Sequence, residues 1–122
     1  MHFAVSDAVS QVLASALDGV TARQRTIADD IANVDTPGFR ASSVDFETQL
    51  RSAIADGSFD AGEPVETGYA VTPTDTPVGA NGNNVDLRKE TMAAVQSQYQ
   101  YQVLTRAVAD RFDLVKTAAT GA

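Results

Sequence analysis

Cysteine is absent from this 122-residue chain, so it can form neither a disulfide framework nor a cysteine-ligated metal site. Histidine occurs once, as His2, and we expect no catalytic role for it because no nearby group would orient the ring. Basic residues are also few: nine Lys and Arg against 16 Asp and Glu give a net charge of −7. Without a basic patch to neutralise phosphates, the chain is not expected to bind nucleic acid.

Long hydrophobic runs are missing as well. No apolar stretch approaches the ~18 residues that a membrane-spanning helix needs. The first residues, MHFAVSDAVSQVLASALDG, have neither a basic start nor a continuous apolar centre. We therefore expect no cleaved secretory signal peptide.

The usual catalytic arrangements are absent too. The sequence has no glycine-rich phosphate loop, no Ser–His–Asp set and no cluster of metal ligands. Asp29 and Asp30 are adjacent, but neighbours on a helix point about 100° apart, so we expect a solvated face and not an acid–base pair. The sequence predicts no enzyme activity, no cofactor and no small-molecule substrate.

A heptad pattern dominates the N-terminal part of the chain. It predicts one helix over residues 6–34, roughly 43 Å long at ~1.5 Å per residue, with Ser6 as its N-cap. Gln24 is the one polar member and fits either a register-setting position or an exposed seam edge. The seam, with spacings of four and three residues, consists of Leu13, Leu17, Val20, Gln24, Ile27, Ile31 and Val34.

The stretch IANVDTPGFR, residues 31–40, is expected to end this helix. Pro37 disfavours helical geometry at Thr36 and has no backbone N–H to donate. Gly38 tolerates a positive φ, so the segment from Thr36 to Phe39 fits a type II turn with Pro37 and Gly38 at its centre. Together with Asn33, these residues indicate a joint and suggest no chemistry of their own.

A short helix is predicted after this joint. Ser43 is its candidate N-cap, Gly57 its end, and apolar residues recur at every fourth position as Phe46, Leu50 and Ile54. Residues 57–84 are then rich in Gly, Pro, Thr, Asn and Asp, and predict an irregular, flexible polar segment. Within this segment only Tyr69 to Thr72 has the composition of a strand, so we expect at most a weak hairpin.

The last long helix is predicted over residues 86–119, roughly 51 Å, with Asn84 or Asp86 as its cap. Two apolar stripes run along it, and two offset stripes imply two contacted faces. One stripe consists of Met92, Val95, Tyr99 and Val103. The other consists of Tyr101, Leu104, Val108, Phe112, Val115 and Ala119.

The predicted architecture is mainly α. Long N- and C-terminal helices pair as a coiled coil, so that residues 1–56 and 85–122 together form one helical core domain around a flexible middle, 57–84. The heptad seam could be the internal core of a small bundle or a surface for assembly. The second stripe favours assembly, because a single partner helix cannot cover both faces.

The motifs also carry a resemblance. Residues 23–50, RQRTIADDIANVDTPGFRASSVDFETQL, resemble the N-terminal signature of the bacterial flagellar axial proteins, the rod and hook family. The segments VDFETQL and GNNVDLRKE and the C-terminal helix are most similar to the proximal rod type, with the middle-rod type as the nearest alternative. The short middle segment resembles a rod subunit that has only the helical core domain.

The resemblance implies a structural role. Subunits of this family are exported unfolded through the flagellar type III apparatus and assemble into a helical tube through coiled-coil helices. The expected partners are copies of the chain, other rod subunits, and components of the basal-body base and export gate, and the expected location is the basal-body rod. A self-contained helical adaptor that forms a discrete monomer or dimer remains the alternative.

Overall fold

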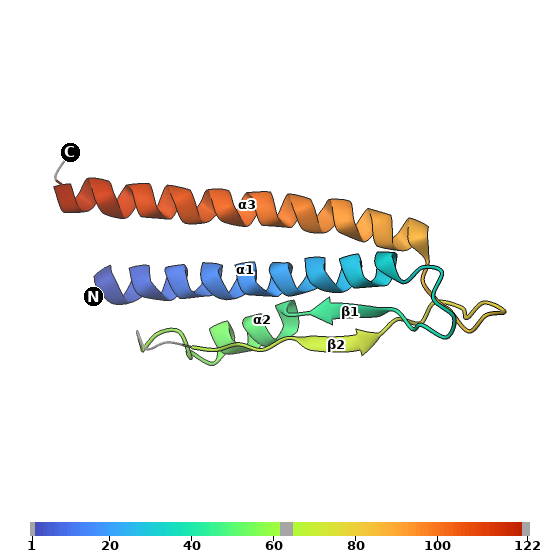
Figure 1. The fold of residues 1–122 in the computed structure, drawn as a ribbon. Coiled ribbons are helices and arrows are strands. Elements are labelled where there is room, and N and C mark those ends of the chain that lie inside the picture. Colours follow the sequence, from blue (N-terminus) through green and yellow to red (C-terminus); the bar gives the residue numbers. More distant parts are fainter. Residues whose placement is uncertain (1, 62–64, 121–122) are drawn as a thin grey trace.

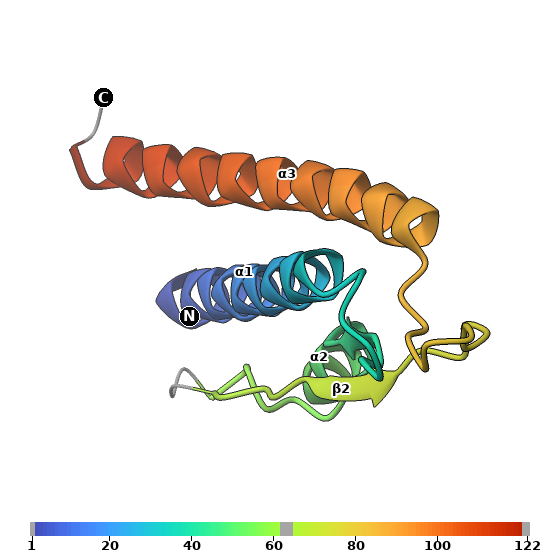
Figure 2. The ribbon, with the colours of Figure 1, turned by 45° about the vertical axis from the view of Figure 1, so that its right-hand side comes forward.

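The computed structural model describes residues 2–61 and 65–120, with side chains from residue 7 onward. Its elements are α1 (His2–Ala32), β1 (Ser42–Asp45), α2 (Glu47–Ala55), β2 (Ala70–Pro73) and α3 (Leu87–Thr120). Helix α1 lies between α3 on one side and α2 with the two strands on the other (Figure 1), and this layering persists in the rotated view (Figure 2). The predicted mainly-α fold with paired terminal helices is confirmed. No helix in the described part of the chain has the length and apolarity to cross a membrane.

Helix α1 starts earlier than predicted. It begins at His2, so Ser6 lies inside the helix, and its prediction as the N-cap is wrong. The helix ends at Ala32, two residues before the predicted end, and Asn33 closes its last turn. The backbone N–H of Asn33 donates to Asp29 O at 3.1 Å, and its Nδ2 donates to the same carbonyl at 2.8 Å. The Asp29 carbonyl thus accepts from both the backbone and the side chain of Asn33, which fixes the last turn of the helix.

The hydrophobic core is small and centres on a glycine in α1. Ala16, Val20 and Phe46 are buried together, with the half-buried Leu50 and Leu104 packed against them. A Cβ atom on Gly19 would lie 2.2 Å from Cγ of Phe46, far inside van der Waals contact. Only glycine lets the Phe46 ring pack directly on the α1 backbone, which brings α2 against α1.

The two strands form an antiparallel pair in which Ser42 lies opposite Pro73 and Asp45 lies opposite Ala70. Ser43 is therefore in β1, and its prediction as the N-cap of the short helix is wrong. Phe46 occupies the N-cap position without a side-chain cap bond. Asp45, one residue earlier, accepts the Thr48 backbone N–H at 3.1 Å through Oδ1 and the Thr48 hydroxyl at 2.7 Å through Oδ2. Gly57 follows the helix with φ +81°, as its prediction as the helix end requires.

The outer edge of β1 is covered by side chains of α1. Ser42 N–H donates to Asp30 Oδ1 at 3.2 Å, and Val44 O accepts from Arg23 Nη2 at 2.7 Å. Arg23 and Asp30 are two helical turns apart, and they pair with alternate residues of the strand as a third strand would. The edge groups are thereby satisfied and the small sheet is fixed to α1.

Helix α3 begins at Leu87, and Asp86 caps it by accepting the Lys89 N–H at 3.1 Å. Its contact face toward α1 differs from the predicted stripes. The buried and half-buried positions that repeat at three and four residues are Glu90, Ala93, Ser97, Gln100, Leu104, Ala107 and Arg111. Small and polar side chains therefore form most of this seam, and of the two predicted apolar stripes only Leu104 joins the core.

Candidate functional site

The joint after α1 consists of two consecutive turns. Thr36 N–H donates to Asn33 O at 3.0 Å, and Phe39 N–H donates to Thr36 O at 3.2 Å. Gly38 has φ +76°, a conformation that glycine adopts without strain. The hydrogen bond from Phe39 to Thr36 and the positive φ at Gly38 agree with the predicted type II turn. Pro37 and Gly38 are exposed, whereas Phe39 is half-buried.

A second segment, residues 74–84, holds this joint in place, and we refer to the two together as the joint clasp. Asn83 is 7% exposed and its Nδ2 donates to two carbonyls of the joint, Asn33 O and Thr36 O, both at 2.8 Å. Gly38 N–H donates back to Asn81 O at 2.9 Å. One buried amide therefore satisfies two carbonyls that the turn leaves without helical partners.

Asn84 continues the clasp toward the sheet. Its Oδ1 accepts Ala41 N–H at 2.6 Å, its N–H donates to Phe39 O at 3.2 Å, and its carbonyl accepts the Thr76 hydroxyl at 2.6 Å. These bonds tie residues 74–84 to the joint, and the flexibility predicted for residues 57–84 stays a prediction. The role of NGNN could not be predicted from the sequence, because the hydrogen-bond partners of Asn83 and Asn84 lie 43 to 50 residues away along the chain.

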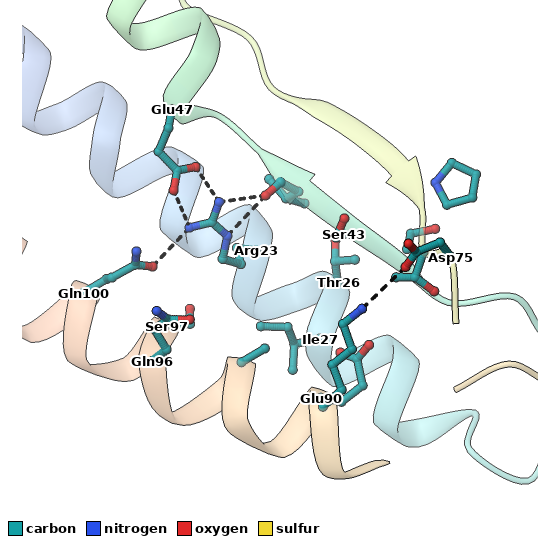
Figure 3. A pocket seen from close by; sticks show the side chains of 16 residues that line it. Arg23, Thr26, Ile27, Ser43, Glu47, Asp75, Glu90, Gln96, Ser97 and Gln100 are labelled. Atoms are coloured by element: carbon teal, nitrogen blue, oxygen red, sulfur yellow. Dashed lines mark hydrogen bonds and ion pairs between the residues drawn. The ribbon is translucent and has the colours of Figure 1, made fainter. Parts of the chain in front are cut away.

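Arg23 connects four elements beside the joint. Besides the Val44 carbonyl of β1, its guanidinium donates to Glu47 Oε2 at 3.0 Å in α2 and to Gln100 Oε1 at 3.1 Å in α3 (Figure 3). It also lies 4.8 Å from the centroid of the Phe46 ring, within cation–π range. Burial raises the pKa of Glu47, but the hydrogen bonds from Arg23 outweigh this and lower the pKa overall.

We refer to Arg23 with its partners Val44, Glu47 and Gln100 as the arginine cluster. This cluster lines a cavity of about 580 Å³ between α1, α3 and the sheet. Polar and apolar side chains contribute about equally to its walls, and the ion pair of Arg23 with Glu47 occupies one end. Asp29 is exposed as expected, but Asp30 is only 1% exposed, so the prediction of a solvated Asp30 is wrong. Among the described residues, no group of three or more His, Cys, Asp or Glu side chains is placed to hold a metal ion.

The residues of the predicted α1 seam are buried to different extents. Val20 and Ile27 are buried, and the remaining members are half-buried: Leu13, Leu17, Gln24, Ile31 and Val34. Gln24 donates from Nε2 to Gln98 Oε1 at 3.4 Å, so it meets a polar partner on α3. The α1 half of the predicted coiled coil therefore faces its own chain.

The predicted stripes on α3 are mostly exposed. Met92, Val95 and Tyr99 are 67–68% exposed, and the last two lie two residues from Ser97, about 200° around the helix from the seam. The stripe that includes Leu104 borders the α1 side of the helix, but several of its members remain open. These are Val108 at 40%, Phe112 at 68% and Val115 at 47% exposure. Along α3, large apolar side chains are thus presented outward over most of its length.

The fold and the joint define a class of protein: a slender antiparallel helix pair with a clasped turn and an unpartnered apolar face. Comparison with known proteins agrees with this description. Residues 11–40, which end at the joint, match the family described as "Flagella basal body rod protein".

Individual relatives extend the match to most of the chain. The flagellar basal body rod protein FlgB of Bacillus subtilis is 32% identical over 119 residues, covering 91% of this chain and 92% of the relative. The FlgB proteins of Borreliella burgdorferi and Escherichia coli are each 30% identical, covering 79% and 80% of this chain. The chain belongs to the FlgB family of flagellar basal body rod proteins.

Proposed function

We propose that this chain polymerises with copies of itself and with other rod subunits to form the proximal drive shaft of the flagellum. The observation that carries the proposal is the outward face of α3, where Met92, Val95 and Tyr99 are about two-thirds exposed. Apolar side chains presented together at helical spacing, away from the molecule's own core, are typical of an interaction surface. Neighbouring subunits would cover this face in the rod.

The proportions of the molecule support assembly. Helices of 31 and 34 residues extend about 46 and 51 Å, yet only one small cluster around Val20 forms the buried core. Such a monomer is held together by few apolar contacts along its length. Folding would therefore be completed by packing against neighbours, as in coupled folding and binding.

This proposal assigns roles to the predicted segments. Residues 1–56 and 85–122 act as one helical core domain that carries torque, and residues 57–84 hold the joint of this domain in place. The assembly face comprises the outward residues of α3, while the α1 seam holds the subunit together. Asn33, Thr36, Pro37, Gly38 and Phe39 fix the direction in which the chain leaves α1.

The same proposal covers location and partners. The subunit would leave the cytoplasm through the flagellar type III apparatus, without a cleaved signal peptide, and contact the basal-body base or export gate as the rod begins. Its role would be structural, without catalysis. A self-contained helical adaptor is the competing function, because the helix pair is closed by its own α1–α3 seam.

Substitution of the outward face separates these functions. Tyr99→Glu places a charge in the proposed interface but touches no core residue, so the purified variant should keep the circular dichroism of the wild type. In a strain in which it replaces the natural protein, it should abolish rods and swimming, because burying an unpaired charge between subunits is costly. Ser52→Glu on α2, on the other side of α1, is the matched control and should swim. Normal motility of the Tyr99→Glu strain would contradict the proposed assembly face and favour the adaptor.

A further inference from the structure

Two acidic side chains are buried against each other where α3 begins. Asp30 on α1 is 1% exposed and Glu90 on α3 is 5% exposed, and they are the buried charged residues of the described chain. Glu90 belongs to the α3 seam that faces α1, and each of the two carboxyl groups has the other as a side-chain hydrogen-bonding partner. Two neighbouring carboxylates cannot both remain ionised away from water without a large cost.

The hydrogen bonds around Asp30 show which group keeps the proton. Its Oδ1 accepts the backbone N–H of Ser42 at 3.2 Å, which favours the ionised form of Asp30. Its Oδ2 is fully buried and accepts no hydrogen bond from the residues that the structure describes. A protonated Glu90 carboxyl would supply that donor.

We propose that Asp30 and Glu90 share one proton in a carboxyl–carboxylate bridge, which locks α3 onto α1 beside the joint and makes closure of the helix pair proton-dependent. This inference concerns the single subunit and does not rest on the proposed role in the rod. Burial and the charge of Asp30 raise the pKa of Glu90 to about 7. The bridge would thus form and dissolve near neutral pH.

The surrounding charges do not offer an alternative partner. On α3, Lys89 lowers and Asp86 raises the pKa of Glu90, but Lys89 Nζ lies 3.8 Å from Asp75 and is largely exposed. On α1, Asp29 adds a further negative charge beside Asp30. The Arg23 guanidinium, in the same cavity, is already engaged by Glu47 and the Val44 carbonyl.

The direction of the pH effect follows from this. The folded protein retains the proton of Glu90 up to about pH 7, whereas an unfolded chain releases it near 4.5. The stability contributed by the protonated Glu90 is therefore fully present below about pH 4.5 and is lost as the pH rises through about 7, and burial also raises the pKa of Asp30, which acts in the same direction. Asp45 and Asp56 have lowered pKa values, so their contributions change below about pH 4, outside this window.

The test uses Glu90→Gln, whose amide can donate permanently to Asp30 Oδ2 without titrating. In urea denaturation, the unfolding equilibrium constant of the wild type should increase roughly tenfold or more between about pH 5 and about pH 8. Glu90→Gln should be nearly independent of pH in this range and more stable than the wild type at about pH 8. Asp110→Asn, which removes an exposed carboxyl of the same helix, should retain the wild-type pH profile.

Parallel pH profiles for the wild type and Glu90→Gln would overturn the proposal. Should the variant fail to fold, carbon-13 NMR titration of the Glu90 carboxyl in the wild type decides the question, and a midpoint near 4.5 would refute the bridge. Millimolar MgCl₂ or CaCl₂ provides a further arm at about pH 8. If either salt stabilises the wild type and not Glu90→Gln, the pair binds a cation in place of a proton and the proposal is wrong.

Discussion

At the scale of single residues, buried and half-buried polar side chains connect the elements of the fold. Asn83 and Asn84 fix the joint, Arg23 links α1 to β1, α2 and α3, and Asp30 reaches both β1 and α3. Each partner is far along the chain, so only the folded structure reveals these roles. The sequence predicted the turn at Pro37 and Gly38 because turn preferences depend on neighbouring residues. It did not predict the roles of the two asparagines because their hydrogen bonds join residues far apart in the chain.

Substitution of Asn83 tests the clasp. Asn83→Asp removes the Nδ2 donor and turns a carboxylate oxygen toward the carbonyls of Asn33 and Thr36, so we expect a loss of about 2 kcal/mol in unfolding free energy. Asn81→Asp is the matched control, because the oxygen that accepts Asn83 N–H is retained. Urea denaturation of both variants measures the difference. Equal stability of Asn83→Asp and the wild type would show that the clasp does not hold the joint.

At the scale of elements, periodicity predicted the two long helices to within a few residues of their ends. It also predicted the α1 seam, because large apolar residues there do face the interior. It did not predict which face of α3 meets α1, since the contact is made through Ala93, Ser97 and Gln100, which carry little hydrophobic signal. The large apolar side chains of the predicted α3 stripes are instead mostly exposed.

Strand β1 was not predicted for a related reason. SSVD has only one buried apolar residue, Val44, and its geometry depends on pairing with β2 and on Arg23 and Asp30 of α1. Such a strand has little intrinsic preference and is specified by tertiary contacts. The N-cap of α2 was predicted wrongly for the same reason. Because no strand was predicted at residues 42–45, Ser43 was assigned to the start of the helix.

A proline in α3 tests the role of that helix as a continuous element. Val108→Pro removes a backbone donor and clashes with the preceding turn, at a local cost of about 3 kcal/mol. Val108 lies beyond Leu104, the last α3 residue packed on the core, so the N-terminal half of α3 should stay in place. We expect reduced helicity by circular dichroism and no incorporation into rods. Val108→Ala should be incorporated normally, and incorporation of the proline variant would contradict a continuous assembly helix.

At the scale of the whole molecule, the described residues form a small core around Val20 and leave a long apolar face of α3 exposed. Internal contacts set the geometry of the subunit through the clasp, the arginine cluster and the Asp30–Glu90 pair. The outward residues of α3 are exposed in the subunit, and we propose that they bind neighbours.

Protection of the outward face is the most direct test of this account. Because the chain has no cysteine, Tyr99→Cys introduces a single thiol at a position that is 68% exposed in the free subunit. Maleimide labelling is then compared between the purified subunit and rods isolated from a motile strain that carries the variant. We predict rapid labelling of the free subunit and strong protection in the rod. Equal labelling rates in the two states would contradict assembly through this face of α3.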